Sequence, residues 1–469
     1  MPSTFSGLYI CLRAMQAQQL SLETYAHNIA NAETDGFSRQ RAVLETTPPW
    51  PMPSINSSGM VGQVGTGVDV ARIERLRDAY LDVQIRKEKG ILGEWTIKQD
   101  TLEQIEIIFQ EPTETGLNSL LTQFWDSWLQ LSMNSEGTSS AVRTTVVETA
   151  SSLCDALRHT KMQLGALSED MDNIIKIKVD QVNSIAEQID ALNNQIKTLK
   201  TAGFEPNDLM DQRDLLLDEL AGVIDFKFQE NDDGTIDVNF FNTETGIYDS
   251  PLVDGAGGSF NTLKIQDDSA VLVKGSGEQT EEIEITVSRG ELKGLFNSKE
   301  MLDQYKEDLE TFVANLITEV NAQHTQGYDI DGEPGQSFFW GEPAADFIEV
   351  NPNIKSDVSK IAAASAPDGG PGDGSNALAV SRLREKGFDD DYRNLISRLG
   401  VDTNESRRMK ENQEALVGQL GERKESISGV SIDEELAHMI ECQHSYQAAA
   451  RFLNTMDQLL DTLINRTAM

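Results

Sequence analysis

The chain has 469 residues, more than one ordinary hydrophobic core accommodates, so we expect two to four domains. Its formal net charge of −38 predicts a surface that repels nucleic acid and anionic membranes, which argues against duplex binding. Aromatic residues make up 6% of the chain, which is low for a large catalytic domain with an aromatic-lined pocket. Solubility or salt tolerance is the simplest explanation of the acidity.

The three cysteines, Cys11, Cys154 and Cys442, lie far apart and predict neither a disulfide framework nor a zinc motif. The first residues lack the basic segment, the apolar segment and the cleavage site of a secretory signal peptide. No apolar run approaches the ~20 residues that cross a bilayer. We therefore expect neither membrane residence nor a cleaved signal peptide, and export with an uncleaved signal stays open.

The segment from Ser6 to about Ala32 is predicted to be helical, because its apolar residues recur in steps of three and four. Such a seam packs against another helix. The seam consists of Leu8, Cys11, Met15, Gln18, Leu22, Tyr25 and Ile29. The turn-forming residues 31–36 then stop the helix, ending in Gly36, which is free to adopt positive φ.

A loop rich in Pro, Gly and Ser, followed by short strand material, is predicted between residues 34 and 78. Helices are expected from Ala79 to Pro112 and from Leu117 to about Leu131. Another helix runs from about Ser139 to Lys200, and its second half has a coiled-coil seam. The seam residues are Leu164, Met171, Ile175, Val182, Ile185, Ile189, Leu192, Ile196 and Leu199.

Residues 207–220, NDLMDQRDLLLDEL, are predicted to form a short amphipathic helix. We interpret its charged residues as a solvated face with i, i+3 ion pairs rather than as acid–base groups. These residues are Asp208, Asp211, Arg213 and Asp214. The periodicity then changes to two from Val223 onward, and NDDG at residues 231–234 is a hairpin signal, which together predict a β domain over about 222–290.

A long helix is expected from Glu291 to about Gln323, with surface loops at 327–341 and 366–378. The chain is predicted to be helical again from Asp391, with an interruption at 427–431. Ser431 and Glu434 form a capping-box pattern at the start of the last helix. The seam of that helix is Ile432, Leu436, Met439, Gln443, Tyr446, Ala450, Leu453, Leu460 and Ile464.

The predicted fold is therefore mainly α with a β insertion. Residues 1–78 and 428–469 would form a coiled-coil inner domain from the two terminal helices. Residues 79–221 and 291–427 would form a long helical-bundle middle domain, and residues 222–290 an outer antiparallel β domain.

Chemical motifs are weak, and we predict no catalytic, cofactor or metal site. His438 and Cys442 have the i, i+4 spacing that can chelate zinc, but a polar helix face is the favoured interpretation because no second ligand pair lies nearby. Asp329, Asp331 and Gly332 suggest the start of a calcium loop, yet Pro334 interrupts it, so a turn stabilised by Asp side chains is expected. The Gly-rich run at 62–67 lacks the Lys-Ser/Thr of a phosphate-binding loop.

Residues 28–40, NIANAETDGFSRQ, resemble the N-terminal motif of bacterial flagellar axial proteins, which reads roughly S-x-N-I-A-N-x-x-T-x-G-[YF]. His27 is a minor departure from that motif. The matching residues are Asn28, Ile29, Ala30, Asn31, Thr34, Gly36 and Phe37.

Further stretches are similar to the hook-associated members of this family that lie at the hook–filament junction. They are the GFSRQ run at 36–40, residues 207–216, the N-x-x-H-x-x-G-x-D-x-x-G loop at 321–339, and the tail 432–465. The short β insertion implies that the extra outer domain of longer relatives is missing.

The resemblance implies a structural subunit that self-assembles into a helical ring zone, with hook protein below and hook-associated protein 3 and flagellin above. It also implies export by the flagellar type III apparatus, an export chaperone on the C-terminal helix, and an extracellular place in the flagellum. Free ends should be disordered before assembly. The implied assembly interface comprises Leu8, Met15, Leu22, Ile29, Asn28, Asn31, Gly36, Phe37, Leu436, Met439, Tyr446, Leu453, Leu460 and Ile464.

Three alternatives compete with this interpretation. One is another axial subunit, such as hook-associated protein 3 or a hook or rod protein, which the segments at 207–216 and 321–339 disfavour. The second is a secreted enzyme on an axial scaffold or a rod-cap muramidase, which would need a catalytic carboxylate pair or metal triad in the β insertion, and the sequence shows none there. The third is a coiled-coil secretion effector, which the axial motif disfavours.

Overall fold

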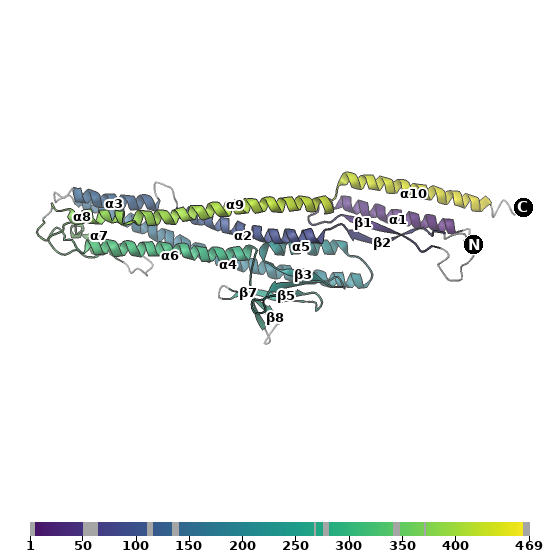
Figure 1. The fold of residues 1–469 in the computed structure, drawn as a ribbon, viewed down its shortest axis with the longest axis horizontal. Helices are drawn as coiled ribbons and strands as arrows, with labels where there is room; N and C mark the ends of the chain where they lie inside the picture. The colour runs from purple at the N-terminus through teal and green to yellow at the C-terminus, as the bar shows by residue number, and fades with distance from the viewer. Residues whose placement is uncertain are drawn as a thin grey trace. The chain divides into compact units, whose positions relative to one another are not determined.

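The computed structural model describes residues 5–49, 64–109, 116–133, 140–266, 269–274, 281–340, 348–369 and 372–462. The fold is mainly helical with small antiparallel sheets, which confirms the predicted fold class (Figure 1). The chain forms two compact units. Unit 1 comprises Met1–Gly90, Asp180–Val287 and Glu414–Met469, and unit 2 comprises Ile91–Val179 and Ser288–Gln413.

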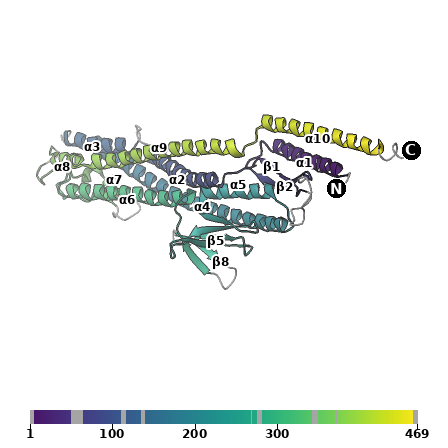
Figure 2. The same ribbon diagram turned by 45° about the vertical axis from the view of Figure 1, so that its right-hand side comes forward.

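The two ends of the chain pair in unit 1. Helix α1 (Ser6–Ala30) packs along α10 (Ile432–Asp461), as the figures show (Figures 1 and 2). The helices are antiparallel, because Gly7 lies against Met456 whereas Tyr25 stacks on His438. The predicted pairing of the terminal helices is therefore confirmed.

The break before the last helix lies where the sequence places it. Three residues separate the end of α9 (Phe388–Ser428) from the start of α10. The Ser431 hydroxyl accepts a hydrogen bond from the Glu434 backbone N–H at 3.5 Å, so one half of the capping box forms. The Glu434 carboxylate accepts instead from Arg39 at 3.1 Å.

An antiparallel ribbon of β1 (Gln40–Thr46) and β2 (Val68–Arg75) contacts α1 in unit 1. Helix α5 (Asn207–Val223) continues three residues beyond the predicted Leu220, since the N–H of Ile224 still bonds the Leu220 carbonyl at 2.9 Å. The predicted strand beginning at Val223 is therefore wrong.

Between α5 and α6 (Glu291–His324) the described residues form seven strands, β3 to β9, in two antiparallel sheets. NDDG joins the first two strands as predicted, and its Gly234 has φ 82°. The four-stranded sheet has the order β3 (Lys227–Glu230), β4 (Ile236–Phe241), β5 (Tyr248–Asp254), β6 (Ser259–Phe260). The three-stranded sheet has the order β7 (Thr262–Gln266), β8 (Ser269–Lys274), β9 (Glu281–Ile285).

Two asparagines of α4 (Ser140–Thr201) bind these sheets to the part of α4 that lies in unit 1. The Asn193 amide bridges both backbone groups of Ile236, at 2.9 and 3.1 Å. Asn183 bridges Leu263 in the same way, at 3.0 and 2.7 Å. Figure 2 shows β5 and β8 beside this end of α4.

Unit 2 is built from long helices, whose predicted positions are confirmed to within a few residues. They are α2 (Ala79–Phe109), α3 (Leu117–Met133), α4, α6 (Glu291–His324) and α9, of which α2, α4 and α9 also contribute residues to unit 1. Of the predicted α4 seam, Leu192 and Leu199 are half-buried and the other seven residues are buried. None of the described helices is long and apolar enough to cross a membrane.

Short elements complete unit 2. The predicted loops at 327–341 and 366–378 contain regular structure at their ends, since β10 begins at Phe339 and α8 begins at Ser375. The short elements are β10 (Phe339–Trp340), β11 (Glu349–Val350), α7 (Pro352–Ser356), η1 (Val358–Lys360), α8 (Ser375–Ser381) and η2 (Arg382–Lys386).

Candidate assembly site at the terminal helices

The terminal helices bury little of their own surface. In the 25 residues of α1 the buried side chains are small or polar: Cys11, Ala17, Ser21, Thr24 and Asn28. Among the 30 residues of α10, the buried residue is Glu435. Large apolar side chains on these helices and beside α1 are 43–64% exposed, namely Phe5, Tyr9, Leu12, Ile432, Leu436, Ile440, Phe452 and Leu459.

The predicted interface residues flank the centre of the helix pair. In α1 the buried stripe runs through Ala17, Ser21, Thr24 and Asn28, one residue before the predicted seam positions from 18 to 29. Most predicted residues are half-buried: Leu8, Met15, Leu22, Ile29, Asn31, Phe37, Met439, Tyr446, Leu453 and Leu460. Leu436 and Gly36 are exposed, Asn28 is buried, and Ile464 lies outside the described residues.

Asn28 joins three segments at the end of α1. Its Nδ2 donates to the Gln40 carbonyl and to Glu435 Oε2, both at 2.8 Å, and its Oδ1 accepts from the Gln40 N–H at 3.0 Å. Its exposure is 0%, so each of these groups would be unsatisfied without its partner. These contacts require a side chain that both donates and accepts hydrogen bonds, as an amide does. This requirement explains physically why Asn occupies this position of the motif.

Arg39 completes the contact with α10. Its Nε lies 2.6 Å from Glu435 Oε1, and its backbone N–H donates to the Ser428 carbonyl at 2.9 Å. The Glu435 side chain is fully buried between Arg39 and Asn28. We call Asn28, Arg39 and Glu435 the hinge clamp, because they join the end of α1 and the segment after it to the first turn of α10.

A second group of charges lies on α5. Asp211 accepts from the Ser38 N–H at 3.0 Å, while Arg75 Nη1 contacts Asp211 and Asp214 at 2.8 Å each. Asp214 also lies 2.6 Å from Arg77. We call the following residues of unit 1 the ionic cluster: Arg75, Arg77, Arg86, Lys424, Asp82, Asp211, Asp214 and Asp218.

The remaining contacts of the ionic cluster extend to α2 and α9. Arg86 Nε lies 2.6 Å from Asp218, and Lys424 Nζ lies 3.2 Å from Asp82 and 3.0 Å from Asp218. Burial opposes the charge on Asp214, but the guanidinium groups of Arg77, Arg75 and Arg86 outweigh it and hold the Asp214 pKa below its usual value. Asp214 is therefore the ionised partner of these three guanidinium groups.

The predicted solvated face of α5 is wrong. Asp211 and Arg213 are 4% and 2% exposed, and their partners lie far away in sequence rather than one turn along the helix. Arg213 donates to Asn193 Oδ1 at 3.1 Å and to the Gly234 carbonyl at 2.7 Å. Asp208 alone of the four predicted residues is largely exposed, and it bonds His27 and Gln40.

The spacing of charges along α5 alone does not reveal the partners of Asp211 and Asp214, because those partners lie on other elements. Arg75 is the last residue of β2, Arg77 lies in the short connection between β2 and α2, and Arg86 lies on α2. One signal in the sequence is the alternation of Arg in RIERLRD at 72–78, which places Arg75 and Arg77 on one side of an extended chain.

The paired His and Cys positions on α10 face α1. The His438 ring stacks on the Tyr25 ring with centroids 5.6 Å apart. Cys442 is half-buried and lies near the Tyr25 side chain. The described residues contain no group of three His, Cys, Asp or Glu side chains arranged to hold a metal ion. His438 and Cys442 thus contribute to the packing of the terminal helices.

The loop at 321–339 in unit 2 is held by its own motif residues. Asn321 bridges both backbone groups of Phe339, at 2.9 and 2.8 Å. The fully buried His324 ring contacts the Gln336 carbonyl through Nδ1 at 2.5 Å and accepts from the Ala362 N–H through Nε2 at 2.9 Å. Burial lowers the His324 pKa to about 4, so the ring is neutral.

Asp329 stabilises the turn in that loop, as predicted. Its Oδ1 accepts from the N–H groups of Asp331 and Glu333, each at 2.9 Å. Gly332 has φ 79°, and a Cβ at Gly335 would overlap the His324 carbonyl. The motif residues therefore have a structural explanation.

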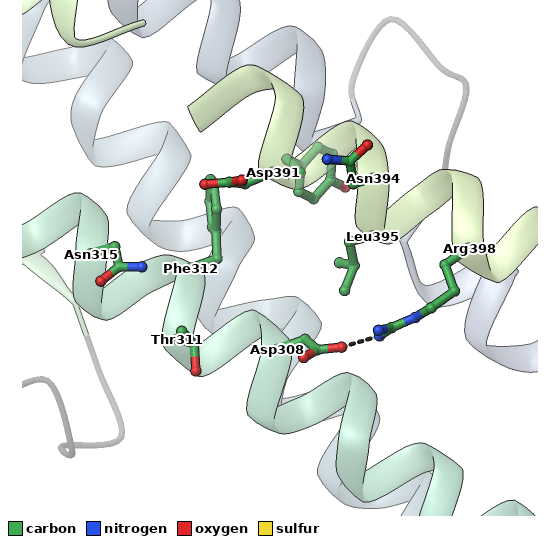
Figure 3. A pocket seen from close by; sticks show the side chains of 9 residues that line it. Asp308, Thr311, Phe312, Asn315, Asp391, Asn394, Leu395 and Arg398 are labelled. Atoms are coloured by element: carbon green, nitrogen blue, oxygen red, sulfur yellow. Dashed lines mark hydrogen bonds and ion pairs between the residues drawn. The ribbon is translucent and has the colours of Figure 1, made fainter. Parts of the chain in front are cut away.

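A pocket lies between α6 and α9 in unit 2, and contacts between these two helices account for the side chains that line it (Figure 3). Asp308 pairs with Arg398 across it, and the Arg398 guanidinium lies over the Tyr305 ring at 5.1 Å. Phe312 and Leu395 line its interior. Its charged groups thus connect two helices.

Comparisons with known proteins agree along the whole chain. Three family models match: "Flagella basal body rod protein" at residues 8–37, "Flagellar hook-associated protein FlgK helical domain" at 102–339, and "Flagellar basal body rod FlgEFG protein C-terminal" at 425–466. The segments that the two rod-protein models match contain most of the terminal helices and include Asn28 and Glu435 of the hinge clamp.

Similar proteins include two named flagellar hook-associated protein 1. That of Bacillus subtilis is 32% identical and covers 99% of both chains, and that of Escherichia coli is 26% identical over 97% of this chain and 98% of its own. A solved structure titled as the flagellar hook junction protein FlgK from Burkholderia pseudomallei superposes with TM-score 0.62 at 16% identity, covering 74% of this chain and 100% of its own. The chain belongs to the flagellar hook-associated protein 1 family of structural flagellar proteins.

Proposed function

We propose that this chain is the subunit that joins hook to filament in the bacterial flagellum, and that filament assembly requires it. The observation that carries the proposal is the apolar surface of the terminal helices, where Tyr9, Ile440 and Phe452 are 53–64% exposed. Helices of this length bury such surface only by packing on a partner. Stacked copies would supply that partner.

The predicted domains give each region a place in this assembly. Residues 1–78 and 428–469 would line the inner tube, 79–221 and 291–427 would form the next shell, and 222–290 would project outward. The exposed seam residues would contact neighbouring copies. Hook protein would bind below this ring zone, and hook-associated protein 3 with flagellin above it.

Export and the absence of catalysis belong to the same proposal. Passage through the flagellar type III apparatus would deliver the chain to the outside, with a chaperone covering the apolar face of α10 beforehand. No catalytic role is proposed, since the buried charges that we describe pair with one another and hold segments together.

Another axial subunit is the second candidate. The match of residues 102–339 to the hook-associated helical domain favours the first, because the terminal motifs are shared with rod proteins whereas this segment has its own family model.

Deleting the gene tests the proposal. We expect cells with complete hooks but no filaments, and flagellin shed into the medium. Filaments on the hooks of the deletion strain would contradict the junction role, and loss of the hooks themselves would indicate a rod or hook subunit instead.

A further inference from the structure

We propose that the hinge clamp sets the axial register in which α1 pairs with α10 when the terminal helices become ordered during assembly. This inference rests on the proposed function, because it concerns the assembled subunit rather than the free chain. It gives Asn28, Arg39 and Glu435 a positioning role, separate from the apolar contacts between copies.

Side-chain packing in the helix pair discriminates poorly between registers. The buried side chains of α1 are small or polar, and they recur about once per helical turn at Ala17, Ser21, Thr24 and Asn28. Sliding one helix by one turn, about 5.4 Å, would therefore present a similar small side chain to the partner helix. The register must come from contacts that occur only once along the pair.

Glu435 makes contacts of this kind. It is the buried residue of α10, its Oε2 accepts from Asn28 at 2.8 Å, and its Oε1 lies 2.6 Å from Arg39 Nε. A shift of one turn would leave this carboxylate inside the pair without the amide and the guanidinium, and a buried charge without a partner is costly. A buried polar residue fixes the register of coiled coils in the same way.

The segment that carries Arg39 is itself attached to other helices of unit 1. The Ser38 N–H donates to Asp211 on α5 at 3.0 Å. The Arg39 N–H donates to the carbonyl of Ser428, the last residue of α9, at 2.9 Å. Because Arg39 also pairs with Glu435, the hinge clamp positions α10 relative to α5 and to the end of α9, as well as relative to α1.

Complementation of a strain that lacks the native gene tests this inference, with Glu435→Gln compared against Glu434→Gln. The two glutamates are adjacent and both lie close to Arg39, but the Glu434 side chain is 63% exposed and that of Glu435 is 0% exposed. Glu434→Gln therefore controls for the loss of one negative charge in the first turn of α10. The measurements are the fraction of hooks that carry filaments and the melting temperature of the purified monomer.

We expect Glu435→Gln to reduce the fraction of hooks with filaments by about tenfold or more, because the carboxylate that closes the hinge clamp is lost. Glu434→Gln should change that fraction by less than roughly twofold, since its side chain is exposed. Neither change should alter the melting temperature of the monomer, because the terminal helices open most readily in the free chain. A loss restricted to assembly distinguishes a positioning role from a role in folding.

A double variant separates the loss of complementary pairing from a general weakening of α10. In Glu435→Gln the Arg39 guanidinium faces a neutral amide, whereas Arg39→Gln combined with Glu435→Gln places two amides that can bond each other. Removing both charges of a buried pair costs less than removing one. We therefore expect the double variant to recover filaments to within about threefold of the wild-type frequency.

Four results would overturn the inference. Filaments at wild-type frequency with Glu435→Gln would show that assembly does not need the hinge clamp. Equal losses with Glu434→Gln would reduce the effect to charge at the start of α10, and no recovery in the double variant would reduce it to a weakened helix. A lower melting temperature of the Glu435→Gln monomer would show a role in folding. Filaments in the strain without the gene would instead contradict the proposed function.

Discussion

Charged and amide side chains in unit 1 connect segments that are distant in sequence, through hydrogen bonds and ion pairs. Asn28 links α1, β1 and α10, and Asp214 links α5 to the residues after β2 and to α2. The Asn28 side chain is fully buried and the Asp214 side chain is 16% exposed, so removing one partner leaves the others poorly compensated. The cost of a substitution here depends on the partners left behind.

Asp214→Asn should destabilise unit 1 because Arg75, Arg77 and Arg86 would lose their shared carboxylate. We expect a loss of about 3 kcal/mol or more in the free energy of unfolding, as for other broken buried pairs. Asp232→Asn, at an exposed position on the hairpin between β3 and β4, should change it by less than about 0.5 kcal/mol. Urea unfolding measures both, and equal small effects would contradict a buried cluster.

His324 should make the stability of unit 2 depend on pH. Its pKa is about 4 in the folded chain and about 6.5 when unfolded, so the unfolded state binds the proton first as pH falls. Stability is therefore full above pH 6.5 and is lost between 6.5 and 4, by up to about 1.4 kcal/mol per pH unit. Tryptophan fluorescence can follow it, because Trp128 lies 5.9 Å from the His324 ring.

His324→Gln removes this titration, so its urea midpoint should change less with pH between 6.5 and 4 than that of the wild type. His159→Gln alters an exposed histidine of α4 and should keep the wild-type dependence. A wild-type pH dependence in His324→Gln would show that other groups cause it.

At the scale of elements, periodicity predicted the helices well and the contacts between them poorly. The ends of α4, α6 and α9 follow from Gly, Pro and turn residues near each boundary, which act locally. The partners of the charges on α5 depend on how β2, α2 and α9 fold around it, and no local pattern contains that information. The seam of α1 lies one residue from its buried stripe for the same reason.

Gly36 sets the turn that leads from α1 to β1. Its φ is 77°, and a Cβ there would lie 3.2 Å from the Leu215 Cβ on α5. Gly36→Ala should therefore destabilise unit 1 by about 1 to 2 kcal/mol. Gly222→Ala, on α5 where a Cβ meets open space, should be neutral or stabilising. Thermal melting of the two variants measures the difference, and equal melting temperatures would contradict a conformational requirement at Gly36.

At the scale of the whole chain, buried surface is unevenly distributed. Unit 2 contains fully buried aromatic side chains such as Trp125 and Tyr305, whereas the terminal helices bury small and polar ones. Local stability follows buried apolar contact, so the ends should open most readily in the free chain.

Limited proteolysis of the free monomer should therefore trim both ends first and spare residues around 80–420. The measurement is the mass of the resistant fragment over time. Ends that survive as long as the middle region would contradict a low stability of the terminal helices before assembly.

Removing α10 and the residues after it tests in cells whether the terminal helix serves assembly rather than folding of the middle region. Deletion of 432–469 should leave a folded middle region, measured by circular dichroism, that no longer joins hook to filament. Motile cells carrying this truncation would rule out an assembly role for α10.

The central claim is that the exposed apolar faces of the terminal helices bind neighbouring copies, and Leu436→Asp tests it most directly. Leu436 is 43% exposed, so the change should barely alter the melting temperature of the monomer. Ile177→Asp, at a 64% exposed apolar position on α4, is the matched control. In a strain lacking the native gene, we predict hook-attached filaments with Ile177→Asp and bare hooks with Leu436→Asp. Filaments at wild-type frequency with Leu436→Asp would contradict the claim.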